Sequence, residues 1–131
     1  MKKVSILICA YNSGKYIFNT ISSVLNQTYS NLELLILDNN SKDETIKNIE
    51  SFNDERIKLF KSNKNYWPYW WLNYLLEKSC WDYVAILDHD DLWANNKLEL
   101  QVDFLEKNNE FIWCWTKTVM YYESDSKYFE Y

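Results

Sequence analysis

The sequence has few of the residues that mark three common classes of protein. Its three cysteines, Cys9, Cys80 and Cys114, are widely spaced and form no CxxC pair, which excludes a disulfide or zinc framework and favours a reduced, cytosolic chain. No strongly basic block accompanies the net charge of −5, so we expect no nucleic-acid partner. No apolar run approaches the length of a membrane span.

Glycine is also nearly absent. The chain has 1 glycine and 7 tryptophans, whereas an average domain of this length has about nine glycines. The remaining composition, with 47% hydrophobic and 25% charged residues, is that of a globular protein and excludes disorder. The length of 131 residues predicts one domain, residues 1–131, with a single core.

Alternating strand and helix patterns predict a sheet of mostly parallel strands flanked by helices. The expected strands are residues 4–9, 32–37, 56–61, 83–87 and 111–122, and the first two helices are expected at 14–26 and 41–52. Ser41 to Glu44 should form a capping box for the second helix. A third helix should begin at Pro68, and a fourth at Asn95 or Asn96, with Leu98, Val102, Phe104 and Leu105 on its apolar side. Residues 123–131 show no clear element.

Three carboxylates follow the most apolar of these strands. Residues 83–87 read as a fully buried strand, and Asp88, Asp90 and Asp91 come directly after it, where open α/β sheets bind their ligands. Like charges this close raise one another's pKa unless a cation lies between them. Mg²⁺ or Mn²⁺ would relieve the repulsion and could also bind a phosphate. The alternative is an acidic turn that caps the next helix.

Two other strand ends carry residues suited to a nucleotide. The first expected strand ends in Ala10-Tyr11-Asn12, and the second ends at Asp38. The Tyr11 ring could stack on a base, and Asp38 could accept a hydrogen bond from a ring N–H or a ribose hydroxyl. Each residue has a simpler interpretation, with Tyr11 as core filler, Asp38 as a turn or cap residue and His89 as an exposed spacer. Together they predict a nucleotide pocket.

Four ordered motifs resemble family 2 glycosyltransferases of the GT-A fold, a Rossmann-like nucleotide-diphospho-sugar transferase fold. They are residues 4–12 (VSILICAYN), 22–29 (SSVLNQTY), 35–43 (LILDNNSKD) and 87–93 (LDHDDLW), followed by Lys97 and Leu98. The resemblance covers about residues 3–122. A phosphoacceptor receiver domain also has acids at strand ends, but it needs an acidic pair where this chain has Ala10-Tyr11-Asn12.

The resemblance implies a nucleotide-sugar donor, most often a UDP-sugar, and Mg²⁺ or Mn²⁺. By the family's pattern, Ala10, Tyr11 and Asn12 line the base and ribose, and Asp38 contacts the uracil. Asp88, Asp90 and Asp91 form the DxD-type motif, in which one acid holds ribose and another the metal. Either Asp90 or Asp91 could be the metal ligand.

The resemblance also implies which parts of the reaction lie elsewhere. An inverting enzyme needs a general base, which family members carry well downstream, beyond Tyr131; Glu123 and Asp125 come too soon. We therefore expect a fragment truncated at its C-terminus, with the donor half of the site and without the half for a saccharide or lipid-linked acceptor. The expected location is cytoplasmic, including the cytoplasmic face of a membrane reached through missing regions. A noncatalytic nucleotide-sugar or carbohydrate-binding module is the alternative function.

The chain departs from the family at several positions. Asn39 stands where a second aspartate is common, which removes one possible acceptor. Tryptophans stand where family members carry glycine or another small residue, whereas the aromatic Trp93 is usual. We hypothesise that these tryptophans are glycines in the source organism, encoded by UGA codons translated here as tryptophan. The alternative is a true aromatic platform at Trp67, Trp70 and Trp71. The recoding hypothesis concerns Trp67, Trp71, Trp81, Trp113 and Trp115.

Overall fold

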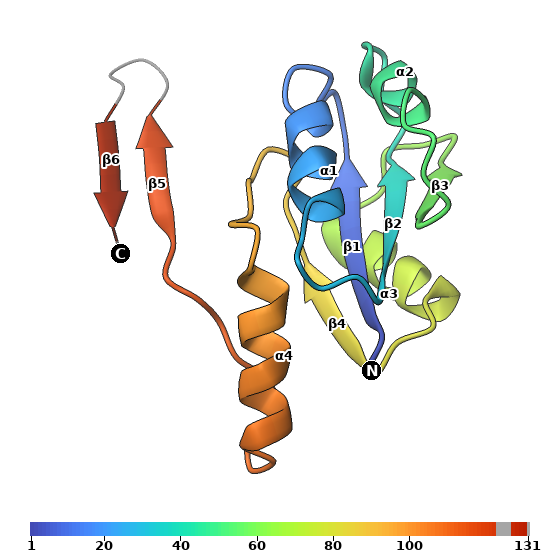
Figure 1. The fold of residues 1–131 in the computed structure, drawn as a ribbon. Helices are drawn as coiled ribbons and strands as arrows, with labels where there is room; N and C mark the ends of the chain where they lie inside the picture. Colours follow the sequence, from blue (N-terminus) through green and yellow to red (C-terminus); the bar gives the residue numbers. More distant parts are fainter. Residues whose placement is uncertain (123–126, 131) are drawn as a thin grey trace.

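Four parallel strands form the centre of the structure, a computed structural model that describes residues 1–122 and 127–130. The strands are β1 (Val4–Ala10), β2 (Leu32–Asp38), β3 (Ile57–Lys61) and β4 (Tyr83–Ile86), in the order β3-β2-β1-β4 (Figure 1). The predicted parallel sheet is confirmed, and each of these strands lies within one residue of its expected ends. The chain therefore extends the sheet from β1 to β3 in one direction and then crosses back to add β4 on the other side of β1.

The two faces of the sheet are covered by different helices, because alternate residues of a strand point to opposite faces. Ile6 and Ile8 of β1 pack in one apolar cluster with residues of α1 (Ile17–Leu25), α2 (Thr45–Glu50) and α4 (Lys97–Lys107). Leu7 points to the other face, where it packs against Leu75 of α3 (Pro68–Lys78). The predicted proline at the start of α3 is confirmed.

The prediction of a fully buried strand at residues 83–87 is wrong. β4 pairs with β1 alone, in the register Val4 with Tyr83 through Leu7 with Ile86, and it forms one edge of the sheet. Among the described residues no strand pairs with its outer edge, and Ile86 is 54% exposed. Periodicity shows that a segment is apolar, but it does not show whether a further strand covers it.

Helices α1 and α2 begin later than the sequence patterns predicted, at Ile17 and Thr45. α2 starts at Thr45 because the expected capping box does not form: the Ser41 hydroxyl accepts a hydrogen bond from the Asn12 N–H, and Asp43 Oδ1 accepts one from the Thr45 N–H. α4 begins after Asn96, as predicted, and buries Leu98, Val102 and Leu105. Phe104, expected on its apolar side, is 42% exposed and lies against Phe111.

The C-terminal part also differs from the prediction. Only Val119–Tyr122 (β5) of the expected strand at 111–122 is a strand, and it pairs antiparallel with β6 (Lys127–Glu130) in a separate two-stranded sheet (Figure 1). β6 lies in a segment for which the sequence predicted no element; Glu123–Ser126 and Tyr131 lie outside the described residues. Across the described ranges, no helix is long and apolar enough to span a membrane.

Candidate functional site

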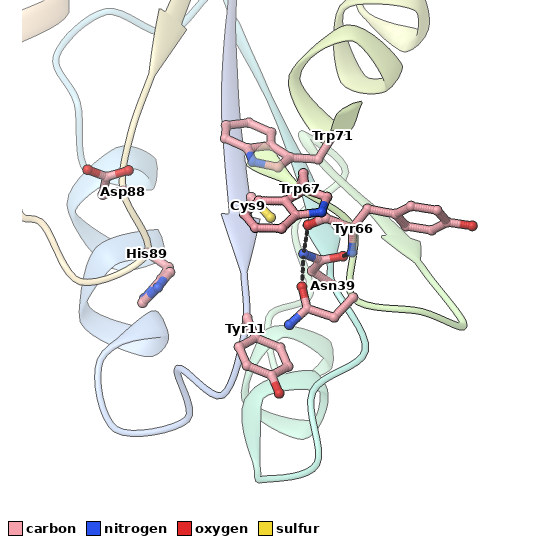
Figure 2. Close-up of a pocket in the computed structure, with 9 residues that line it drawn as sticks. Cys9, Tyr11, Asn39, Tyr66, Trp67, Trp71, Asp88 and His89 are labelled. Atoms are coloured by element: carbon pink, nitrogen blue, oxygen red, sulfur yellow. Dashed lines mark hydrogen bonds between the residues drawn. The ribbon is translucent and has the colours of Figure 1, made fainter. Parts of the chain in front are cut away.

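A pocket of about 570 Å³ opens where β1, β2 and β4 end (Figure 2). β1 and β4 are neighbours in the sheet, and the order in which the chain adds strands reverses between them. Open α/β sheets bind ligands at such switch points. The lining residues come from all three strand ends, from the loop before α3 and from α3 itself. They are Cys9, Tyr11, Asn39, Asn65, Tyr66, Trp67, Trp71, Asp88 and His89.

The loops after β1 and β2 are tied to each other. The Asn12 N–H donates to Ser41 Oγ at 2.9 Å, and the Lys42 N–H donates to Asn12 Oδ1 at 2.8 Å. Asn12 adopts a left-handed backbone with φ of 47°, a conformation that asparagine tolerates better than most residues. The structure therefore shows Asn12 joining two loops beside the pocket, and its predicted ribose contact remains a prediction.

The single glycine lies where these loops come closest. The Gly14 N–H donates to Asp43 Oδ2 at 2.9 Å, and a Cβ atom at this position would lie 2.9 Å from the same oxygen. Burial alone would raise the pKa of Asp43, but hydrogen bonds from Thr45 and Gly14 outweigh it and leave the pKa below its usual value. Close approach, and not a left-handed backbone, explains the glycine.

Asp38 ends β2 in a buried position, with 1% of its surface exposed. Its Oδ2 accepts a hydrogen bond from the Ser41 N–H at 3.1 Å, as the turn interpretation predicted. Its Oδ1 is buried and has no partner among the described residues. A buried carboxylate oxygen without a donor is uncommon in native proteins and marks a place where a ligand donor would be stabilised.

Tyr11 and Ala10, the other predicted residues at the end of β1, differ in burial. Tyr11 is 42% exposed and lines the pocket, so it is not core filler. Ala10 is fully buried, and its carbonyl accepts a hydrogen bond from the Asn39 N–H at 2.8 Å. Cys9 also lines the pocket; burial, and then the charge of Asp38, raise the pKa of its thiol to about 12. The thiol is therefore neutral at physiological pH and is not a nucleophile.

The acidic turn after β4 brings one of its three carboxylates to the pocket. Asp88 and His89 line it, while Asp90 and Asp91 are exposed on the turn beyond. Loss of hydration raises the pKa of Asp91, and the charges of Asp88 and Asp90 raise it further, which is the repulsion that the spacing predicted. Among the described residues no three His, Cys, Asp or Glu side chains form a metal-binding group.

Helix α1 holds this turn in place through polar side chains that sequence reasoning missed. Thr20 Oγ1 donates to the His89 carbonyl at 3.0 Å, and Gln27 Nε2 donates to the Ala94 carbonyl at 2.7 Å. Ser23 Oγ accepts a hydrogen bond from the backbone of the same segment. The available signal was the spacing of Thr20 and Ser23 in α1 and of Gln27 just after it, which is the spacing of residues on one face of a helix.

The tryptophans differ in burial, and Trp71 is partly buried against the core cluster of Leu7 and Leu75. Trp93 is partly buried and packs against the main core, with Lys97 Nζ 5.2 Å from the centre of its ring. Trp67 is 86% exposed, and Trp81, Trp113 and Trp115 are 53%, 61% and 74% exposed. Among described residues other than glycine, only Asn12 and Asn40 have positive φ, so no described tryptophan occupies a backbone conformation that favours glycine.

One ring of the proposed aromatic platform, that of Trp70, stacks with other rings of the chain. The rings of Tyr66, in the loop before α3, and of Tyr74, one helical turn after Trp70, stack on it with centroid distances of 4.0 and 5.3 Å and interplanar angles of 20° and 11°. Lys78 Nζ lies 5.6 Å from the Tyr74 ring centre. These contacts use part of the Trp70 ring, and 42% of the Trp70 surface stays exposed.

A parallel sheet with a pocket at its switch point defines a Rossmann-like α/β domain. Residues 5–127 match the family model described as Glycosyl transferase family 2. An uncharacterized glycosyltransferase of Haemophilus influenzae is 40% identical over 111 residues, which cover 83% of this chain and 44% of that protein. The Escherichia coli UDP-Glc:alpha-D-GlcNAc-diphosphoundecaprenol beta-1,3-glucosyltransferase WfgD is 42% identical over 106 residues, 81% of this chain and 42% of that relative.

The chain therefore belongs to glycosyl transferase family 2, and it spans less than half the length of these two relatives. Its fold is similar to that of S. aureus TarS 1-349 in complex with UDP, with a TM-score of 0.77 at 24% identity over 91% of this chain and 34% of that one. The mannosyltransferase PcManGT of Pyrobaculum calidifontis, solved with GDP-Man and Mn2+, gives a TM-score of 0.74 at 25% identity over 79% and 32%. The predicted family and GT-A fold are confirmed.

Proposed function

We propose that this chain is the donor-binding part of a glycosyltransferase that transfers a sugar from a UDP-sugar to a saccharide or lipid-linked acceptor, with inversion at the sugar carbon. The observation that carries the proposal is the pocket at the switch point, which both the exposed Tyr11 ring and Asp88 line, together with the buried, unpaired oxygen of Asp38 at the end of β2. WfgD, by its name, uses UDP-Glc and a lipid-linked acceptor, which supports this choice of donor and acceptor.

Each side chain has a role that its environment supports. The Tyr11 ring offers a face to the base, and Asp38 Oδ1 offers an acceptor to a uracil N–H or a ribose hydroxyl. Asp88 lies at the pocket wall, where it would accept from ribose. Ala10 and Asn12 hold the loop that carries Tyr11. The general base is expected beyond Tyr131, and the domain, residues 1–131, is proposed to lack the acceptor half.

The acidic turn fits a divalent cation. Asp90 and Asp91 are exposed carboxylates whose repulsion a cation would relieve, and Mg²⁺ or Mn²⁺ needs only one or two carboxylates when phosphate oxygens and water complete its shell. PcManGT was solved with Mn2+, which supports this assignment. When bound, the ion would stabilise the charge that develops on the leaving diphosphate.

The noncatalytic carbohydrate-binding alternative has weaker support, because the rings of Tyr66 and Tyr74 already stack on Trp70. A calorimetric titration of the chain with UDP, with and without Mn²⁺, separates the two functions. We expect Mn²⁺ to tighten UDP binding, and Asp90→Ala to abolish the metal effect while Glu110→Gln, an exposed acid outside the pocket, leaves it unchanged. Metal-independent binding of oligosaccharides that is lost in Trp70→Ala would reverse the conclusion.

A cytoplasmic location is part of the same proposal. Cys9, Cys80 and Cys114 are all free thiols, as a reducing compartment would keep them. A donor made in the cytoplasm would meet the chain there. Contact with a membrane, if a lipid-linked acceptor requires it, is proposed to involve regions outside these 131 residues.

A further inference from the structure

Asn39, the residue that departs from the family's second aspartate, contacts the loop before α3. Its side chain is buried, with 4% of its surface exposed. Nδ2 donates to Asn65 Oδ1 at 2.7 Å and to the Tyr66 carbonyl at 2.9 Å, while Oδ1 accepts a hydrogen bond from the Tyr66 N–H at 2.9 Å (Figure 2). One side chain thus holds both backbone polar groups of Tyr66.

This set of contacts requires an amide. The Tyr66 N–H can only donate and its carbonyl can only accept, so the partner must present an acceptor to one and a donor to the other. A carboxylate could accept from the N–H, but it would place an oxygen against the Tyr66 carbonyl and a second negative charge beside Asp38. Both Nδ2 hydrogens of Asn39 are used, so its amide group has no donor left for a ligand.

The loop that Asn39 holds forms one wall of the pocket. Asn65, Tyr66 and Trp67 all line it, and the Tyr66 ring stacks on Trp70 of α3 at 4.0 Å. The hydrogen bonds to Asn39 therefore connect the end of β2 to the first turn of α3 through Tyr66. Without them, the wall opposite Asp88 and His89 would lose its connection to the sheet at this point.

We infer that Asn39 is a positioning residue: its amide fixes the 65–67 wall of the pocket, and in this chain the position recognises the protein's own loop instead of the nucleotide. The consequence for ligand affinity rests on the proposed function, because it assumes that the pocket takes a nucleoside diphosphate. The contact between Asn39 and the loop does not depend on that assumption.

Hydrogen exchange measured by mass spectrometry on the 131-residue chain without nucleotide tests the contact itself. Asn39→Asp should speed exchange of the amides at 63–67 by about tenfold, the effect expected from losing one buried hydrogen bond, while the amides of β1 exchange at the wild-type rate. Asn65→Ala, which removes the acceptor from an exposed side chain, should speed the same segment and guards against an unfolded first variant. Asn53→Asp, an exposed site away from the pocket, makes the same chemical change as a control.

The inference is overturned if residues 63–67 exchange at the wild-type rate in both variants, or if β1 accelerates equally, since the effect would then be global. UDP titration with Mn²⁺ gives the second readout. We expect the Kd of Asn39→Asp for UDP to rise about tenfold while the amides of β1 stay as protected as in the wild type, and the Kd of Asn53→Asp to stay the same. A wild-type chain that binds no UDP but shows the exchange difference contradicts the proposed function and supports the role of Asn39 in the loop.

Discussion

Glu33 on β2 and Lys58 on β3 form an ion pair, with Lys58 Nζ 2.7 Å from Glu33 Oε2, although only 3% of the Glu33 surface is exposed. Ser5 Oγ and the Cys80 N–H donate to the other carboxylate oxygen at 2.6 and 2.7 Å. Burial would raise the pKa of Glu33, but the hydrogen bonds from Lys58, Ser5 and Cys80 lower it to about 2. A buried acid therefore connects β1, β2, β3 and the end of α3 in its charged form.

Acid should destabilise the chain through this group. The folded pKa of about 2 lies below the usual 4.5, so the stabilisation is complete above pH 4.5 and is lost as the pH falls toward 2. Glu33→Gln should lower the free energy of unfolding at pH 7 by about 2 kcal/mol and flatten its dependence between pH 5 and 3. Urea unfolding at several pH values measures both. An equally steep pH dependence in Glu33→Gln would show that other groups cause it.

Truncation of the α3 core residue should destabilise the sheet face that it covers. Leu75 is fully buried against Leu7, Leu35 and Leu37, so Leu75→Ala should cost about 3 kcal/mol of unfolding free energy. Tyr69→Ala, on the same helix but 84% exposed, should change it by about 0.5 kcal/mol or less. Chemical denaturation of both variants gives the comparison; equal losses would contradict the packing of α3.

The main strands were predictable from the sequence, whereas their surroundings were not. β1 and β2 are predominantly apolar runs that any parallel sheet would bury, so their bounds hold to within a residue. The start of α2 was not predictable, because the Ser41 hydroxyl and Asp43 Oδ2 accept hydrogen bonds from the Asn12 and Gly14 N–H groups of a distant loop. Only Asp43 Oδ1 accepts from the Thr45 N–H at the start of the helix. Local patterns do not contain such tertiary partners.

The location of the site was predictable from the sequence, but the contacts between its residues were not. Strand ends identified Tyr11 and Asp88, which line the pocket, and Asp38, whose unpaired oxygen lies at the end of β2. The polar face of α1 and the Asn39 contacts depend on which segment packs opposite, and a single sequence does not show this. Asp90 and Asp91 lie outside the pocket lining, and their metal role remains a prediction.

Substitution of the single glycine should strain the contact between the loops after β1 and β2. In Gly14→Ala the new methyl would meet Asp43 Oδ2 at 2.9 Å, and we expect a loss of about 1 to 2 kcal/mol. In an Asp43→Ala background the clash is absent, so the same change should cost less than about 0.5 kcal/mol. Urea unfolding of the four chains completes the double-mutant cycle. Additive losses would mean that the cost of alanine at 14 arises elsewhere.

Removal of the hydrogen bonds of Gln27 should weaken the acidic turn more than the fold. Gln27 accepts from the Leu98 N–H at 3.0 Å and donates to the Ala94 carbonyl, which also accepts from the Lys97 N–H. Gln27→Ala therefore leaves the Leu98 N–H without this partner and should cost about 2 kcal/mol of unfolding free energy. We also expect the Mn²⁺-dependent part of UDP binding to fall by about tenfold. Asn19→Ala, at an exposed position of α1, is the control for both measurements. Unchanged metal dependence of UDP binding in Gln27→Ala would show that the Gln27 contacts do not support the metal site.

The tryptophans give a prediction that can be tested at the level of the gene. A residue that folding requires should be tryptophan in the source organism, and Trp93 fits this because it packs against the core beneath Lys97. Trp67 and Trp81 are largely exposed, so folding does not require an indole there. If UGA encodes glycine in the source, Trp93 is TGG, while TGA stands at most of positions 67, 71, 81, 113 and 115.

The same hypothesis predicts the behaviour of variants. Trp93→Gly should cost about 3 kcal/mol of unfolding free energy, whereas Trp81→Gly should change it by less than about 1 kcal/mol, since an exposed indole buries little surface. Thermal and urea unfolding of the two variants provide the test beside the codons. TGG at all six positions would reject recoding. The indoles would then be true features of a domain whose pocket wall carries Trp67 and Trp71.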